Sequence, residues 1–131
     1  MVDRVDKIWM DGELVNWEDA NVHILTHTLH YGVGTFEGIR SYRRTDGTSV
    51  LFRLGDHIQR LLDSCKIMGL DCPFDKTTIE AACVDLMRVN GLDEGYVRPL
   101  VYISDGAMGL YANNPVRLAI VVWRWGAYLG D

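Results

Sequence analysis

The sequence predicts an α+β fold, a two-layer sandwich in which two helices pack on one face of a mostly antiparallel β-sheet. Three observations predict it. Strand-like segments are grouped before and after two amphipathic helical segments, instead of alternating with them, and Asp11-Gly12 joins the first two strands by a tight turn. At 131 residues the chain has the size of one ordinary domain, so we expect a single domain over residues 1–131.

The elements of the first half follow from turn chemistry. Residues 7–10 and 13–16 are predicted to form a hairpin, because Asp-Gly readily adopts the positive φ of its turn. Residues 17–34 are expected to be irregular, with one short helical turn through residues 26–31. Strands are predicted over residues 35–42 and 49–53, separated by the polar loop 43–48.

Two helices follow. We expect the first to begin near Asp56 as N-cap and to end at Gly69 in the left-handed conformation. The second is predicted to begin after Asp75 and to end at Asn90-Gly91. Their apolar stripes, spaced as on a helix, comprise Ile58, Leu61, Leu62, Cys65 and Met68, and Ile79, Ala82, Cys83 and Leu86.

Two further strands complete the prediction. Residues 96–103 contain Pro99, which cannot donate to a ladder, so we expect this strand at an edge or bulged. Residues 116–123 carry an apolar run that predicts a strand buried on both faces. The glycine-flanked aromatic segment after residue 123 is typical of a hand-over to a further segment, so we interpret the chain as interrupted there.

Composition excludes several classes of function. A net charge of −5 and a pI of about 5.2 argue against nucleic acid as a partner. No apolar run reaches about 18 residues, so no membrane span is expected. The first residues mix both charges without an apolar core, which is unlike an export signal. Three cysteines without metal-pair spacing fit reduced thiols, and we expect a cytoplasmic protein.

Residues 30–40 combine aromatic rings, glycines and a terminal arginine, the mixture typical of small-molecule sites, although a glycine-rich strand and turn packed on a core remains an alternative. Arg98 lies inside an apolar strand and needs a carboxylate, a phosphate or a water-filled site. Arg60 borders the first apolar stripe, where it either binds an anion or extends into solvent, and Arg40 either joins the pocket or ends a strand at the surface. Together, the three guanidinium groups indicate a pocket for an anionic substrate or cofactor.

Other chemistries have weaker support. The histidines at positions 23, 27 and 30 have spacings that a helical metal site could use, but hydrogen bonds to backbone are the favoured interpretation and we expect no metal. No serine-centred nucleophile motif or phosphate-binding glycine loop is present. No setting that would neutralise its amine can be argued for any of the lysines, Lys7, Lys66 and Lys76.

A series of motifs resembles a known family along essentially the whole chain. The chain resembles the N-terminal domain of class IV (fold type IV) pyridoxal-phosphate aminotransferases, specifically the branched-chain amino acid aminotransferases. The last motif favours this subgroup over D-amino acid transaminases and aminodeoxychorismate lyases. The motifs are Ile8-Trp-Met-Asp-Gly-Glu13, Trp17-Glu-Asp-Ala20, His30-Tyr-Gly32, Phe36-Glu-Gly-Ile-Arg40, Phe52-Arg53, Asp56-His57, Arg60-Leu61, Tyr96-Val-Arg-Pro99, Met108-Gly109 and Trp125-Gly-Ala-Tyr-Leu-Gly130.

The resemblance implies a role for each matching residue. Arg60 would anchor the phosphate of pyridoxal 5'-phosphate, and Gly38 would let the backbone approach the substrate. Arg98 would meet the second carboxylate of glutamate, supported by Tyr96 and Arg40. The remaining implied residues line the pocket for the aliphatic side chain, Phe36, Trp125 and Tyr128, or reach across a dimer interface, Tyr31 and Leu110.

The resemblance also implies a missing part. In the family, the lysine that forms the Schiff base with the cofactor lies in a following C-terminal domain, and this chain ends before it. We therefore expect the chain to be the small domain of a homodimeric or larger transaminase acting on leucine, isoleucine or valine with 2-oxoglutarate, and to be inactive alone. The alternative is a stand-alone, non-catalytic module that binds an anionic ligand or drives dimerisation.

Overall fold

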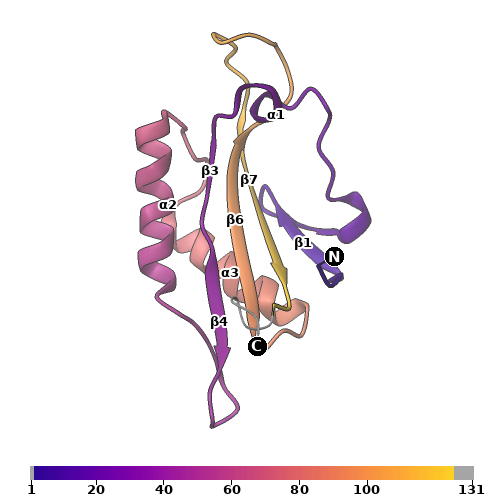
Figure 1. The fold of residues 1–131 in the computed structure, drawn as a ribbon, viewed down its shortest axis with the longest axis vertical. Coiled ribbons are helices and arrows are strands. Elements are labelled where there is room, and N and C mark those ends of the chain that lie inside the picture. The colour runs from indigo at the N-terminus through magenta and orange to yellow at the C-terminus, as the bar shows by residue number, and fades with distance from the viewer. Residues whose placement is uncertain (1, 126–131) are drawn as a thin grey trace.

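The computed structural model describes residues 2–125 and shows an antiparallel seven-stranded sheet flanked by helices (Figure 1). The α+β prediction is confirmed. No helix within residues 2–125 combines the length and apolarity that crossing a membrane requires. The elements are β1 (Lys7–Met10), β2 (Glu13–Asn16), the 3-10 helix η1 (Trp17–Asp19), α1 (His27–Tyr31), β3 (Gly34–Phe36), β4 (Ile39–Arg43), β5 (Ser49–Leu51), α2 (Leu54–Met68), α3 (Lys76–Val89), β6 (Gly95–Ile103) and β7 (Val116–Trp123).

The sheet has the order β2-β1-β7-β6-β4-β5, and β3 also pairs with β6, in line with β4. The long strands β6 and β7 form its centre, with Tyr96 opposite Trp123 at one end and Ile103 opposite Val116 at the other. The predicted hairpin of β1 and β2 is confirmed, and Asp11 adopts the positive φ that its turn needs. Figure 1 shows α2 running alongside β3, at the edge of the sheet.

The expectation that Pro99 marks an edge or bulged strand is wrong. Strand β6 pairs with β7 on one side and with β3 and β4 on the other, and its register with β7 runs through Pro99 without an extra residue. The Pro99 carbonyl accepts a hydrogen bond of 3.1 Å from the backbone of Glu37, which lies between β3 and β4. In an antiparallel ladder the N–H and C=O of a residue point to the same neighbour. The missing donor of Pro99 therefore coincides with the interruption of the neighbouring strand at residues 37–38.

The helix boundaries are close to the predicted ones. Helix α2 begins at Leu54, two residues before the expected N-cap, because Arg53 adopts the left-handed conformation (φ 52°) directly before it. Asp56 lies in the first turn, where its carboxylate accepts a hydrogen bond of 2.6 Å from Arg53 Nε. The predicted start of the second helix after Asp75 is confirmed, and the Asp75 side chain caps it by accepting a hydrogen bond of 2.8 Å from a backbone N–H of α3.

The two faces of the sheet differ in cover. Alternate residues of the central strands, such as Val97, Leu118 and Ile120, are fully buried against α2 and α3. The prediction that β7 is buried on both faces is wrong, because the residues between them are only half-buried. We call the opposite side of the sheet the open face; pleat alternation assigns to it Phe36, Gly38, Arg40, Tyr96, Arg98, Leu100, Tyr102, Ala119, Val121 and Trp123.

Candidate functional site

Two side-chain clusters meet at the interruption between β3 and β4. Because successive residues of an extended chain point to opposite faces, Phe36 and Gly38 lie on the open face while Glu37 points toward α2. Phe36 contacts Arg98, and Glu37 binds Arg60. One stretch of backbone therefore holds together two arginines that are 38 positions apart on opposite sides of the sheet.

On the open face, three aromatic rings surround the guanidinium of Arg98. Its carbon Cζ lies 4.3 Å from the ring centroid of Phe36, 5.3 Å from that of Tyr96 and 5.8 Å from that of Trp123. Nη2 donates a hydrogen bond of 3.0 Å to the Tyr96 hydroxyl. The buried Nε has no hydrogen-bond partner, and no acid among residues 2–125 pairs with the guanidinium. An unpaired buried N–H on a cation suits an anionic ligand group.

An aromatic wall borders this cation. The ring centroid of Tyr96 lies 4.9 Å from that of Trp123 and 4.8 Å from that of Trp125. A Cβ at position 38 would overlap the Tyr96 hydroxyl, so only glycine leaves Tyr96 its place beside Arg98. The structure thus provides a reason for Gly38 within the chain itself, besides the implied approach of substrate to its backbone.

On the other side, Arg60 of α2 is bound by Glu37. Arg60 Nε donates to one carboxylate oxygen at 2.6 Å and Nη2 donates to the other at 2.7 Å, while His57 Nδ1 lies 2.8 Å from the second oxygen. Burial raises the pKa of Glu37, but the hydrogen bonds from Arg60 and His57 outweigh it, so the net pKa is below its ordinary value of 4.5. The same hydrogen bond raises the pKa of Arg60. Both groups are charged at neutral pH.

A cavity of about 260 Å³ opens beside this pair and is lined by Arg53, Asp56, His57 and Arg60. Arg53 is paired with Asp56 at this wall, so the donors offered to a negatively charged group such as a phosphate are those that Glu37 leaves uncovered on Arg60. The contacts to Glu37 leave Arg60 Nη1 without a partner in the part of the chain that the structure describes. The residues present therefore fit the phosphate of the implied cofactor.

The other residues implied by the resemblance are spread along the sheet. Arg40 lies on the open face with its Cζ 5.7 Å from the Tyr42 ring centroid. Tyr31 belongs to α1, and Leu110 belongs to the loop between β6 and β7, which follows the Ile103 end of β6. Figure 1 shows α1 at that same end of the sheet. There the loop between β6 and β7 is tied to α1 by a hydrogen bond of 2.9 Å between His27 Nε2 and a loop carbonyl. The predicted pocket residue Tyr128 lies outside the described residues.

The histidines bind backbone, as the favoured interpretation predicts. His30 Nε2 lies 2.8 Å from the carbonyl of Ile24, and His23 Nδ1 accepts a hydrogen bond of 3.1 Å from the N–H of Leu25. Within residues 2–125, no cluster of three or more histidine, cysteine or acidic side chains has the arrangement of a metal site. The three cysteines are free thiols.

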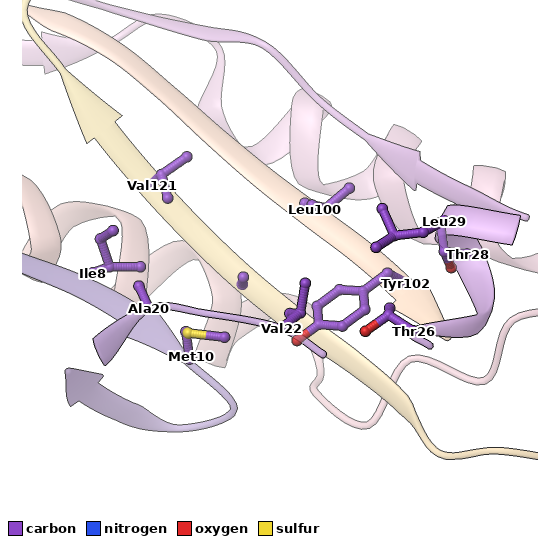
Figure 2. A pocket seen from close by; sticks show the side chains of 11 residues that line it. Ile8, Met10, Ala20, Val22, Thr26, Thr28, Leu29, Leu100, Tyr102 and Val121 are labelled. Carbon is purple, nitrogen blue, oxygen red and sulfur yellow. The ribbon is translucent and has the colours of Figure 1, made fainter. Parts of the chain in front are cut away.

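An apolar groove of about 220 Å³ also lies on the open face. Figure 2 shows Leu100 of β6, Val121 of β7 and Met10 of β1 around it, with Val22 from the segment between η1 and α1. Leu100 stands two residues from Arg98 on the same strand face, so the groove continues the open face away from the cation.

Sequence reasoning did not include Glu37, His57 and Trp123 among the site residues. Glu37 and His57 belong to motifs of the family resemblance, but the resemblance implied no role for them. Pleat alternation places the side chain of Glu37 on the other face of the sheet from that of Phe36, and the spacing of three places His57 beside Arg60 on α2. The sequence therefore contained a signal for each of these two residues. Trp123 would have followed from its pairing with Tyr96, which requires the register of β6 and β7.

Comparison with known proteins identifies the family of the chain. The family model described as "Amino-transferase class IV" matches residues 34–128. A branched-chain-amino-acid aminotransferase of Pseudomonas aeruginosa is 47% identical over 132 residues, and one of Escherichia coli is 43% identical over 129 residues. These alignments cover 100% and 97% of this chain but only 43% and 41% of the relatives, so the chain spans less than half of their length.

Solved structures show the same relation. The crystal structure of the Escherichia coli branched-chain amino acid aminotransferase superimposes with a TM-score of 0.92 at 43% identity, covering 97% of this chain and 42% of that one. The T.th. enzyme of the same name, complexed with N-(5'-phosphopyridoxyl)-L-glutamate, superimposes with a TM-score of 0.89 at 35% identity, covering 95% of this chain and 42% of that one. On the match of the family model, the chain belongs to the class IV aminotransferases.

Proposed function

We propose that residues 1–131 form the N-terminal, small domain of a pyridoxal-phosphate-dependent transaminase that moves the amino group between branched-chain L-amino acids and 2-oxoglutarate. The observation that carries the proposal is Arg98, a partly buried cation with an unpaired Nε inside an aromatic cluster. A transaminase of this kind must accept both an aliphatic side chain and a second carboxylate in one pocket. A cation beside apolar walls meets both needs.

Each substrate uses a different part of the cluster. The second carboxylate of glutamate or 2-oxoglutarate accepts hydrogen bonds from the Arg98 guanidinium, which the Tyr96 hydroxyl holds in place. The aliphatic side chain of leucine, isoleucine or valine rests against Phe36 and Trp125. Arg40, which shares the open face, adds positive charge to the same side of the sheet.

The cofactor is held through Arg60. When bound, pyridoxal phosphate supplies the electron sink that stabilises negative charge on the substrate α-carbon. Arg60 binds the phosphate with the guanidinium edge that Glu37 leaves uncovered, at the cavity shared with Arg53 and His57. Arg60 would then hold the phosphate from the α2 side of the β3–β4 segment, and Arg98 would hold the substrate's carboxylate from the open face.

The acid–base lysine is proposed to come from polypeptide that corresponds to the remainder of the relatives' length. The lysines present have polar partners: Lys7 donates to Asn16 at 2.7 Å, Lys66 lies 3.6 Å from Asp63, and Lys76 lies 3.8 Å from Glu80. None of these lysines is among the residues that line the cavity beside Arg60 or the rings around Arg98. The 131-residue chain alone is therefore proposed to be inactive.

A second copy of the protein is proposed to complete the site. Leu110, in the loop beside α1, is 79% exposed, and the apolar groove lies on the same open face. Exposed apolar surface of this kind is usually covered by association. With Tyr31 nearby on α1, the loop can reach a partner's site. Light scattering on the complete protein is expected to give a dimer or a larger closed assembly, and a monomer would contradict it.

Amino transfer from leucine to 2-oxoglutarate tests the proposal. We expect turnover from the protein made from the complete reading frame that contains residues 1–131, and none from the 131-residue chain with added pyridoxal phosphate. Absence of turnover with leucine, isoleucine and valine in the complete protein would contradict the proposed activity. Turnover by the short chain, with a borohydride-trapped adduct on one of its lysines, would contradict its proposed inactivity.

A further inference from the structure

A buried carboxylate stands behind the arginine proposed to bind phosphate. The side chain of Glu37 is 6% exposed whereas that of Arg60 is 67% exposed. Both carboxylate oxygens accept hydrogen bonds from the guanidinium. A long, exposed arginine on a helix surface normally samples many rotamers, and a bidentate contact with a buried partner selects one of them.

The contact uses one edge of the guanidinium and leaves another. The group carries five N–H donors, on Nε, Nη1 and Nη2. Glu37 takes the side edge, formed by Nε and one N–H of Nη2. The end edge, formed by Nη1 and the second N–H of Nη2, is left, and it offers the same parallel pair of donors to a phosphate.

His57 fixes the carboxylate in turn. His57 Nδ1 lies 2.8 Å from Glu37 Oε2 but 3.5 Å from Arg60 Nη2. The shorter contact assigns the proton to Nδ1, which donates to the carboxylate; Nδ1 then has no lone pair for the arginine. His57 and Arg60 stand one helical turn apart on α2, so both donors reach the same carboxylate from one rigid element.

We propose that Glu37, held by His57, is a positioning residue that presents the end edge of Arg60 to the cofactor phosphate. This inference rests on the proposed function, in which Arg60 binds that phosphate. Glu37 acts only through Arg60 and does not itself contact the cofactor. It is an acidic group that strengthens the binding of an anion.

The direction in which one substitution changes the affinity for phosphate distinguishes positioning of Arg60 from a simple effect of charge. Glu37→Gln removes a negative charge near the phosphate site, so Coulomb attraction alone predicts tighter binding of the phosphate. It also replaces one acceptor oxygen with an NH₂ group that faces donors, so the guanidinium loses its fixed orientation. Positioning therefore predicts weaker binding, the opposite direction.

The experiment measures dissociation constants of the apo-protein, made from the complete reading frame, for pyridoxal phosphate and for pyridoxal, which lacks the phosphate. Their ratio isolates the phosphate contribution from any general damage to the site. We expect Glu37→Gln to lower this preference for the phosphorylated form by about tenfold, as expected for one side chain that must be ordered on binding. Glu37→Asp, which keeps the charge but withdraws the carboxylate, is expected to lower it less, and it serves if the first variant fails to fold.

Three further variants complete the design. Glu80→Gln makes the same chemical change at an ion pair on α3 and is expected to leave the ratio unchanged. Arg60→Ala is expected to remove most of the preference, and adding Glu37→Gln to it is expected to change nothing more. A ratio that is unchanged or higher in Glu37→Gln, or an equal loss in the Arg60→Ala background, would overturn the positioning role alone. An Arg60→Ala variant that keeps the full preference would overturn the phosphate assignment in the proposed function as well.

Discussion

The two faces of the central strands differ in how their side chains find partners. Facing α2 and α3, residues such as Val97 and Leu118 are fully buried in one contiguous core. Facing the other way, Arg98 keeps an unpaired buried N–H, and Leu100, two residues further, is 37% exposed. Adjacent residues of β6 therefore have different surroundings, one in the core and the next on the open face. One face of the strand is part of the hydrophobic core, and the other is proposed to serve ligand binding and association.

This division implies that stability and binding respond to different substitutions in the same strand pair. A change on the helix-covered face should cost folding free energy and alter ligand preference little. A change on the open face should do the reverse. Gly38 and Glu37, at the β3–β4 interruption, are exceptions. Each contributes both to the packing of the sheet and to the position of a side chain in the candidate site.

The largest effect is expected on the helix-covered face. Leu118→Ala removes a fully buried side chain and should lower the free energy of unfolding by about 2–5 kcal/mol. Leu100→Ala on the open face should cost less than about 1 kcal/mol, because the side chain is partly solvated already. Urea denaturation of the 131-residue chain measures both. Equal losses would break the comparison between the faces.

The next effect is on substrate choice. Arg98→Met keeps an apolar side chain among Phe36, Tyr96 and Trp123 but removes the cation. In the complete protein, kcat/KM for glutamate should fall about 10- to 100-fold, the worth of hydrogen bonds to a charged group, while that for leucine changes little. Arg88→Met on α3, which removes an exposed ion pair, is the matched control. A parallel loss for both substrates would show that Arg98 does not read the second carboxylate.

A third substitution tests whether Gly38, at the β3–β4 interruption, is required for the packing of Tyr96. Gly38→Ala inserts a methyl group into the place of the Tyr96 hydroxyl and should cost about 1–3 kcal/mol of stability by overpacking. Gly55→Ala, in α2, meets only ordinary contacts and should be neutral or stabilising. Thermal unfolding compares the two. If Gly38→Ala were as stable as the parent, Tyr96 would be free to move and the reason given for the glycine would be wrong.

The smallest effect is the dependence of stability on pH. Because the native pKa of Glu37 is below its ordinary value of 4.5, the folded chain binds fewer protons there than the unfolded chain. The contribution of the ionised Glu37 carboxylate to the free energy of unfolding is complete above pH 4.5 and is lost as the pH falls through the native pKa. The stability advantage over Glu37→Gln should therefore shrink below pH 4.5. An advantage that grows on acidification would contradict the sign; urea titrations from neutral to acid pH measure it.

Local signals in the sequence were enough for much of the fold. The hairpin turn at Asp11, the start of α3 after Asp75 and the left-handed Gly69 are each decided by a few adjacent residues, and all three were predicted correctly. Pro99 was misplaced at an edge because its missing N–H is matched by a break in a strand more than 50 positions earlier. The order of strands in the sheet places residues 37–38 beside Pro99, and neither β6 nor the β3–β4 segment predicts that order alone.

The site divides in the same way. Arg98 could be singled out because a charge inside an apolar strand needs a partner, and the structure shows it unpaired by any described acid. The partner of Arg60 was missed because Glu37 lies 23 positions away and reaches it only through the packing of α2 on β3. The resemblance implied a role for Arg60 but none for Glu37, the carboxylate that binds it.

The most direct test of the open face as half of a substrate site uses N-(5'-phosphopyridoxyl)-L-glutamate, the compound in the structure of the T.th. enzyme. A crystal structure of the complete protein with this compound should show its phosphate within hydrogen-bond distance of Arg60 Nη1. The side-chain carboxylate of its glutamate part should be within hydrogen-bond distance of Arg98. A complex in which either anionic group binds away from its arginine would contradict the central claim.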